Sequence, residues 1–586
     1  MRSHYTIIFV TGFIETRTQY SQAQSIYSVL YDSNSIMLKF KLLLAKSLYG
    51  SLKILNFKSI FQVAFYNLIL ATLINLPALG AERITFSFAP FGEFYLSADA
   101  LELFAKEGKI DSDFAFYAKF ATPQQLAVLR SFLQQHFPIS PVMVSQFTYS
   151  PLGEEIIRQL GKLVETEGNQ NGFYALRSAL ILAATDPQGM TVLDVLHRFP
   201  SDSLKLNLNQ GITIAKNFSK RLKQQQAAVS EIKKQAAATS AVTIDFSQKP
   251  DLRQVGPLTW QKITLSLYDA SRSRQFASDI YLPHTTTNKL IPLVVISHGA
   301  FSDRTTFAYL AQHLASYGFA TAVLEHPGIS RQRFQQYFAG LATPPETRES
   351  INQPLDVKYL LDELERRQKS DPRLSRLALH QVGVIGQSAG GYTALALAGA
   401  TINFEQLNKA CQNNRELWNF PLLVQCKTTE LLPGSYSLQD KRIKAAIAVN
   451  PLTSSLLGQS GLSQIQEPVM MVASGNDFIA PADTEQIRPF TWLSTPDKYL
   501  VMMEQGTHLS TLGDIGNYNF GAISSTLMGP SSENARKYLS ALSVAFMETY
   551  IANNDEYRPY LSTAYAKFLS QPPLNLDILQ SLAIAK

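Results

Sequence analysis

The sequence predicts an α/β fold: a mostly parallel sheet of eight strands in the C-terminal part of the chain, preceded by a mainly helical region. After about residue 260, short apolar runs alternate with segments of helical periodicity. The early runs follow one another directly, and the later ones are separated by helices. This order is typical of a sheet covered by helices on both faces. Before residue 215, apolar side chains recur at helical spacing instead.

The composition limits the classes of function. At 586 residues the chain is long enough for two to four domains. Its formal charge of +6 is concentrated in residues 1–80, which carry seven Lys/Arg against Glu15 and Asp32 and leave +1 for the remainder. A nearly neutral body argues against nucleic-acid binding.

The leader has the layout of a secretory signal. Lysines precede an apolar run at residues 60–76 and small residues follow it, so cleavage is expected between Gly80 and Ala81. The start codon is open between Met1 and Met37. The alternative is an uncleaved membrane anchor formed by residues 60–76, although this run is short for a membrane span. In both cases the body of the protein is expected outside the cytoplasm.

Residues 81–215 are predicted to form a mainly helical domain that begins with one strand at 82–88. Thr122 precedes a proline and is followed three residues later by glutamine, which is a pattern of helix capping. Similar helix starts occur at Ser150 and Thr191. Metal-ligand spacings, phosphate loops and acidic pairs do not stand out here, so the sequence assigns this domain no function.

Residues 216–255 are interpreted as a linker between domains. They begin with a segment rich in Ala, Gln and Lys that has only a thin apolar stripe. This composition predicts a solvated connecting helix.

Residues 256–586 are predicted to hold the sheet. The expected strands are residues 261–268, 275–282, 292–297, 319–324, 381–386, 443–449, 468–473 and 498–503. An insertion at residues 401–442 precedes the sixth strand and is longer than such connections usually need.

The fifth strand leads into a G-x-S-x-G motif centred on Ser388, and a helix of small residues follows. This strand-turn-helix context is typical of a nucleophile elbow. Gly386 and Gly390 lack the Cβ atoms that would keep strand and helix apart around a strained serine. The motif therefore predicts Ser388 as a nucleophile.

A serine hydroxyl needs a base that takes its proton and an acid that orients the base. After such an elbow, the acid and the histidine follow the serine in the chain. Of the nine histidines, only His508 lies after Ser388. Asp477, in the loop after the seventh strand, is the expected acid, and Asp483 is the alternative.

These residues resemble the α/β-hydrolase fold. Residues 256–555 are similar to bacterial relatives of the group formed by platelet-activating factor acetylhydrolase (isoform II) and dienelactone hydrolase. The motifs that carry this resemblance lie at residues 297–304, 324–328 and 354–364. Residues 82–210 resemble a domain of unknown function found chiefly in cyanobacteria ahead of such hydrolases.

The resemblance implies an oxyanion hole made by the backbone N–H groups of Ala300 and Ala389. Each such donor is worth about 3 kcal/mol to the transition state. His298 and His326 are then expected to be structural. One departure is Gln387, where the group often has histidine; it weakens the assignment of substrate more than that of catalysis.

The implied activity is that of an exported serine esterase or lipase-like hydrolase, similar to 1-alkyl-2-acetylglycerophosphocholine esterase. It would cleave small-molecule or lipid esters through an acyl-enzyme. No cofactor or metal is implied, and contact with a membrane surface is left open. Two alternatives stand: an envelope binding or scaffolding protein with an inactive hydrolase fold, and a peptidase of the same fold.

The insertion holds both cysteines of the chain, Cys411 and Cys426. In an oxidising compartment a disulfide between them is expected, and two unrelated buried cysteines are the alternative. In the fold that the sequence resembles, an insertion at this position overhangs the serine. The segment is therefore interpreted as a lid or a wall of the acyl pocket.

Overall fold

The computed structural model describes residues 80–88, 92–239, 244–412, 419–513 and 525–583, all within the compact unit Ala78–Lys586. The expected signal, with Met1, Met37 and residues 60–76, lies outside the described residues. No helix in the described part of the chain is long and apolar enough to span a membrane.

Residues 80–207 combine seven helices with a small sheet of strand order β2-β1-β4-β3. The elements are β1 (Arg83–Phe88), β2 (Gly92–Ser97), α3 (Ala98–Glu107), α4 (Ser112–Ala118), α5 (Pro123–Leu133), α6 (Pro141–Thr148), α7 (Pro151–Leu160), β3 (Val164–Thr166), α8 (Phe173–Ala183), α9 (Val192–His197) and β4 (Ser203–Leu206). Complete capping boxes start α5 at Thr122 and α9 at Thr191, as their spacing predicts. Only β1 was expected; β3 and β4 are short, and β2 follows β1 directly without a clear pattern of its own.

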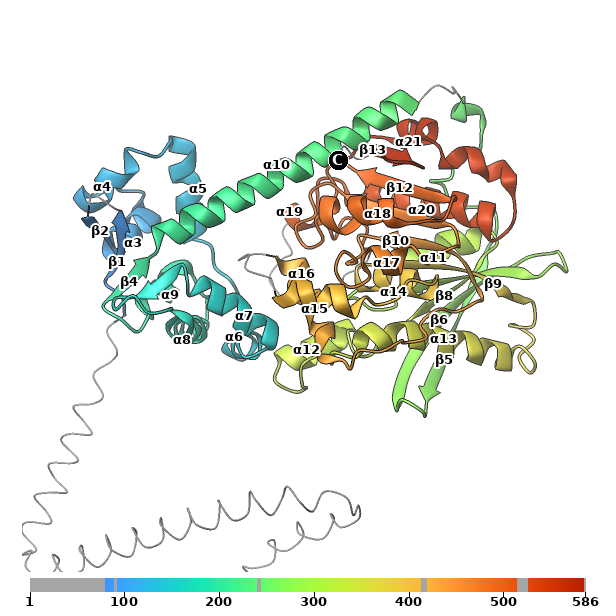
Figure 1. Cartoon of the computed structure of the whole chain (residues 1–586), viewed down its shortest axis with the longest axis horizontal. Helices are drawn as coiled ribbons and strands as arrows, with labels where there is room; N and C mark the ends of the chain where they lie inside the picture. The colour runs from blue at the N-terminus through green and yellow to red at the C-terminus, as the bar shows by residue number, and fades with distance from the viewer. Residues whose placement is uncertain (1–79, 89–91, 240–243, 413–418, 514–524, 584–586) are drawn as a thin grey trace, which may run out of the picture. The chain divides into compact units, whose positions relative to one another are not determined.

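The C-terminal domain is built on a nine-stranded sheet of order β13-β12-β11-β10-β9-β7-β8-β6-β5 (Figure 1). Its strands are β5 (Trp260–Asp269), β6 (Arg274–Pro283), β7 (Ile291–Ser297), β8 (Ala320–Leu324), β9 (Leu377–Gln387), β10 (Ile443–Val449), β11 (Val469–Ser474), β12 (Lys498–Met503) and β13 (Leu576–Leu579). Strands β7 to β12 pair in parallel, and antiparallel pairs occur only toward the two edges. The eight expected strands are present, and β13 adds a ninth.

Helices cover both faces of this sheet. The helices of this domain are α11 (Ala308–Ser316), α12 (Arg331–Phe338), α13 (Glu349–Arg367), α14 (Ala389–Leu397), α15 (Phe404–Gln412), α16 (Phe420–Cys426), α17 (Gly458–Leu462), α18 (Arg488–Trp492), α19 (Ser525–Met528), α20 (Ser532–Tyr550) and α21 (Thr563–Leu569), and α15 and α16 belong to the insertion. Single turns are η1 (Phe246–Gln248), η2 (Lys427–Glu430), the π-helical η3 (Asp483–Ile487) and η4 (Asp555–Leu561).

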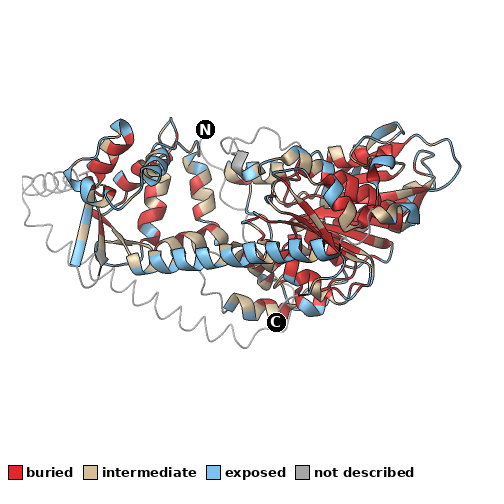
Figure 2. Cartoon of the chain, turned by 90° about the horizontal axis from the view of Figure 1, so that it is seen from above, coloured by how far each residue is buried: buried red, intermediate tan, exposed pale blue. Residues whose placement is uncertain are grey.

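Strand β7 shows how the two faces divide the core. Leu293 and Val295 pack with the side of α13 and α14, whereas Val294 and Ile296 pack with the side of α11 and α20. Successive side chains of a strand point to opposite faces, so a strand covered on both faces is apolar throughout. Figure 2 shows these central strands as buried.

Helix α10 (Leu208–Thr239) runs from the end of β4 to the C-terminal domain. Its interpretation as a solvated connector is wrong for its C-terminal half. Ile232 and Ala236 are fully buried in the same core as α13 and α14, and Gln225 is also buried. The apolar stripe is thin because the helix buries one narrow face and exposes the rest (Figure 2).

Candidate active site

Ser388 stands on a sharp turn between β9 and α14. Its φ of 55° and ψ of −119° lie outside the regions that L-residues favour. A Cβ atom at Gly386 would lie 1.9 Å from the Gly390 carbonyl oxygen, and one at Gly390 would lie 2.0 Å from the Ser297 carbonyl oxygen. Both motif glycines are therefore needed for strand and helix to meet, which is the geometry of a nucleophile elbow.

The structure brings His508 and Asp477 together. His508 Nδ1 lies 2.7 Å from Asp477 Oδ2, and both side chains are buried. The other carboxylate oxygen accepts the backbone N–H groups of Ile479 at 2.8 Å and Ala480 at 2.7 Å. Since an ionised carboxylate only accepts, Nδ1 donates, and Nε2 is left to take a proton from a hydroxyl.

A side-chain hydrogen bond links the histidine loop to the elbow. The Gln387 amide, one residue before the serine, donates to the backbone oxygen of His508 at 3.1 Å. Gln387, which departs from the family pattern, therefore connects the elbow to the loop that carries His508. The alternative acid, Asp483, lies on η3, and its pKa is raised by burial. Among the described residues, it is Asp477 that contacts the imidazole.

The loop after β7 lies directly against the nucleophile. A Cβ atom at Gly299 would approach the Ser388 Cβ atom to 3.0 Å. Ala300 follows in this loop, and Ala389 is the first residue of α14, whose first N–H groups have no partner within the helix. In the described part of the chain neither of these two N–H groups donates to a protein acceptor. Both are thus free to bind an oxyanion beside Ser388.

Two families match parts of the chain, and neither match includes Ser388, Asp477 or His508. Residues 260–368 match platelet-activating factor acetylhydrolase, isoform II, and residues 80–207 match an alpha/beta hydrolase of unknown function (DUF1400). The fold is that of an α/β-hydrolase. Both resemblances expected from the sequence are confirmed, and together with the fold they show a hydrolase. No curated protein matches the chain.

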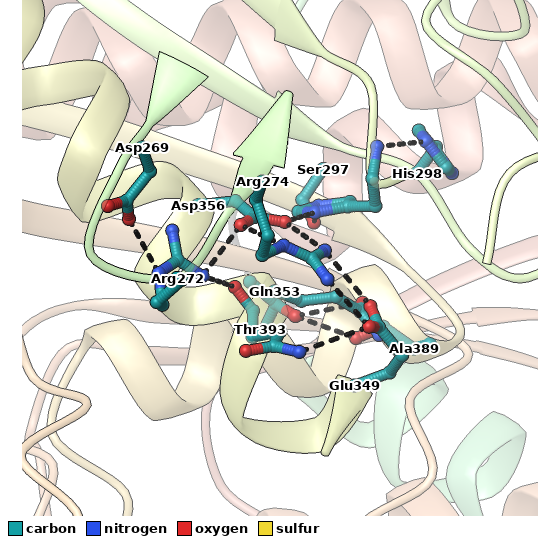
Figure 3. A network of polar contacts seen from close by, with 12 residues as sticks. Asp269, Arg272, Arg274, Ser297, His298, Glu349, Gln353, Asp356, Ala389 and Thr393 are labelled. Carbon is teal, nitrogen blue, oxygen red and sulfur yellow. Dashed lines mark hydrogen bonds and ion pairs between the residues drawn. The ribbon is translucent and has the colours of Figure 1, made fainter. Parts of the chain in front are cut away.

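A buried polar network supports the loop after β7 (Figure 3). His298 Nε2 accepts the His326 backbone N–H at 2.9 Å, so its Nδ1 donates to the Gly299 carbonyl oxygen at 2.8 Å. Burial, with His326 adjacent, lowers the pKa of His298 to about 3. A histidine that stays neutral keeps one donor and one acceptor, which is what these two bonds require. His298 is structural, as expected.

The same network contains a second Ser-His-Asp array. His326 lies between Ser297 Oγ, 2.8 Å from its Nε2, and Asp356 Oδ2, 3.2 Å from its Nδ1. Each of these three residues is 0% exposed, so no substrate reaches them. The array therefore braces the C-terminal ends of β7 and β8 and is not a second catalytic site.

Two arginines neutralise the acid of this array. Arg272 and Arg274 each contact Asp356 at 2.8 Å, and Arg274 also pairs with Glu349. Burial opposes ionisation of Asp356, but its bonds to His326 and Arg274 outweigh burial and lower its pKa. Sequence reasoning missed this network, because a carboxylate on an amphipathic helix such as α13 is normally a solvated one.

The insertion is closed by a disulfide between Cys411 and Cys426, as expected, which joins α15 to α16. Residues 413–418 of the insertion lie outside the described residues. Gln425 of α16 accepts the backbone N–H groups of residues 455–456 at 2.9 and 2.8 Å and donates to Glu485 of η3 at 3.2 Å. The insertion is thereby docked on the loop after β10 and on η3, which follows the loop that carries Asp477.

Across the described ranges, His, Cys, Asp and Glu do not gather in any group of three or more that could hold a metal ion.

Proposed function

We propose that the chain is an exported serine hydrolase that cleaves carboxylic esters through an acyl-enzyme. Ser388 attacks the ester carbonyl. His508 takes the proton of the Ser388 hydroxyl and donates it to the leaving alcohol. Asp477 orients the imidazole, and the N–H groups of Ala300 and Ala389 stabilise the oxyanion. A water molecule then attacks the acyl-enzyme in the same way and releases the carboxylic acid of the substrate.

One observation carries this proposal: the hydrogen-bonded His508–Asp477 pair, 2.7 Å apart, is joined through Gln387 to a serine in elbow geometry. A structural turn has no need of a strained serine whose neighbour, Gln387, binds the backbone of a loop that carries a buried histidine. The complete set of roles also disfavours a binding or scaffolding protein with an inactive fold.

The substrate class rests on the family match over residues 260–368. Small-molecule esters, including the short acyl groups of lipids, fit that match. Export rests on the signal layout of the leader, and contact with a membrane surface belongs to the same proposal.

Fluorophosphonate labelling of the purified protein, followed by an ester panel graded in acyl length, tests the mechanism. We expect Ser388→Ala to abolish labelling and to lower aryl-ester turnover by at least about 10⁴-fold, because triad members act as a unit. His508→Ala should be equally damaging. Asp477→Asn should be somewhat milder, and Asp483→Asn is its matched control, expected to stay near the wild-type rate.

Three outcomes would redirect the proposal. Unchanged turnover in Ser388→Ala would exclude the serine mechanism. Loss of activity in Asp483→Asn but not in Asp477→Asn would identify Asp483 as the acid that orients His508. Peptide cleavage that exceeds ester cleavage in the same panel would make the protein a peptidase.

A further inference from the structure

Three consecutive glutamines lie in the middle of α10, and only one of them is buried. Gln224 and Gln226 are exposed to solvent, whereas Gln225 is 7% exposed. A buried amide needs hydrogen-bond partners, since burying it without them destabilises the fold. The partners of Gln225 are therefore informative.

Gln225 reaches the loop that carries the acid of the triad. Its Nε2 lies 2.6 Å from the Gly475 carbonyl oxygen and 3.5 Å from the Asp477 carbonyl oxygen. Both of these atoms only accept, so the amide nitrogen faces them with its two hydrogens. A residue 250 positions earlier in the chain thus binds the backbone on each side of Asn476.

Two further backbone bonds of this loop come from the segment that leads to His508. Gly475 donates its N–H to Met503 at 2.9 Å, and Asn476 donates its N–H to Gly506 at 2.8 Å. Both acceptors precede His508 in the chain. Two N–H groups of the Asp477 loop are therefore bound by the segment between the end of β12 and His508, and two of its carbonyl groups are bound by α10.

Helix α10 also contacts the histidine side of the site. Lys233 Nζ lies 2.9 Å from Glu504 Oε1, at the end of β12 and four residues before His508. Bonds from Asn575 and Lys233 lower the pKa of Glu504 even though burial opposes this, so the pair is ionised. Gln225 and Lys233, on two turns of α10, thereby contact both the loop that carries Asp477 and the segment that leads to His508.

We propose that Gln225 is a positioning residue for the catalytic acid, and that α10 is part of the catalytic scaffold. This inference rests on the proposed serine mechanism. By fixing the Gly475 and Asp477 carbonyl groups, Gln225 keeps the carboxylate in line with His508 Nδ1. Because α10 starts directly after β4, the N-terminal domain is connected to the acid through one helix.

The kinetic test compares Gln225→Ala with Gln224→Ala and Gln226→Ala in the full-length protein. For Gln225→Ala we expect kcat on a small aryl ester to fall about tenfold with KM unchanged, because small misplacements of a catalytic group are costly. The acidic limb of its pH–rate profile should move to lower pH, since a misplaced carboxylate stabilises the imidazolium less. Gln225→Glu, which puts an acceptor against two acceptors, should lose at least as much.

Hydrogen–deuterium exchange of the amides in residues 475–480 gives a readout that needs no activity. Exchange should rise in Gln225→Ala and stay at the wild-type level in the two control variants. Unchanged exchange would overturn the contact, and raised exchange with unchanged kcat and pH profile would overturn the positioning role. If no hydrolysis depends on Ser388, the serine mechanism fails by itself, and exchange still decides whether α10 holds the loop.

Discussion

At the scale of single residues, the site depends on one strained serine. A non-glycine residue at φ 55° costs on the order of 1–3 kcal/mol. Bonds on both sides hold Ser388 there: its N–H donates to Val449 at 2.8 Å, and its carbonyl oxygen accepts from Tyr392 at 3.0 Å. The strain is thus imposed by β10 and α14, and it presents the hydroxyl at the end of the sheet.

A second residue-scale feature is the half-buried acid Glu548 of α20. Burial raises its pKa to about 7 from an ordinary 4.5. Below the unfolded value both states are protonated. As the pH rises from 4.5 to 7, the unfolded chain ionises more readily, so this group makes the fold progressively less stable. We expect Glu548→Gln to raise the Tm at pH 8 by about 2 °C and to have no effect near pH 4.

Calorimetry across this pH range measures the effect, with the exposed Glu556→Gln as the matched control. A difference between Glu548→Gln and wild type that does not depend on pH would show that the packing of the side chain, and not its charge, is responsible.

At the scale of elements, the insertion acts as one docked unit. The disulfide joins its two helices, and Gln425 attaches α16 to the loop after β10. That loop in turn approaches the elbow, since a Cβ atom at Gly391 would lie 3.1 Å from Pro451 Cβ. A change in the insertion can therefore reach the elbow without altering the His508–Asp477 pair.

We expect reduction, or Cys411→Ser, to lower activity on bulky or lipid-like esters more than on a small aryl acetate. Closing a loop of this length contributes about 3 kcal/mol in the chain-entropy model, so its loss should loosen α15 and α16. Turnover of both esters by oxidised and reduced protein measures this. Equal losses on all esters would show that the insertion is not part of the substrate pocket.

At the scale of the whole molecule, the proposed export predicts where the mature protein begins. Ala81 is 1% exposed in the core of the N-terminal domain, and the neighbouring Glu82 donates its N–H to Asp202 at 3.1 Å. Processing between Gly80 and Ala81 leaves these contacts in place. Under the proposed export, the positive charge of the leader would be removed with it, which would leave a nearly neutral protein.

We therefore expect the protein recovered from cells to begin near Ala81. A gene that starts at Met37 should yield the same mature protein as one that starts at Met1. N-terminal sequencing of both products decides this. A mature chain that still carries residues 60–76 would instead establish the membrane anchor.

Local patterns were sufficient for much of the fold and the site. Each expected strand of the C-terminal sheet forms within a few residues of its expected bounds, because a strand covered on both faces must be apolar along its length. Ser388 follows from a motif whose glycines the turn requires. His508 follows from chain order alone, and Asp477 from its place after β11.

Contacts between distant segments could not be predicted in this way. Nothing in the sequence distinguishes Gln225 from the two neighbouring glutamines, yet it is buried and binds a carbonyl group 250 residues away. Asp356 has the spacing of an ordinary surface acid and nevertheless lies at the centre of the buried network. Polar side chains obtain their roles from the acceptors, charges and desolvation around them, and these arise only when the folded chain brings its segments together.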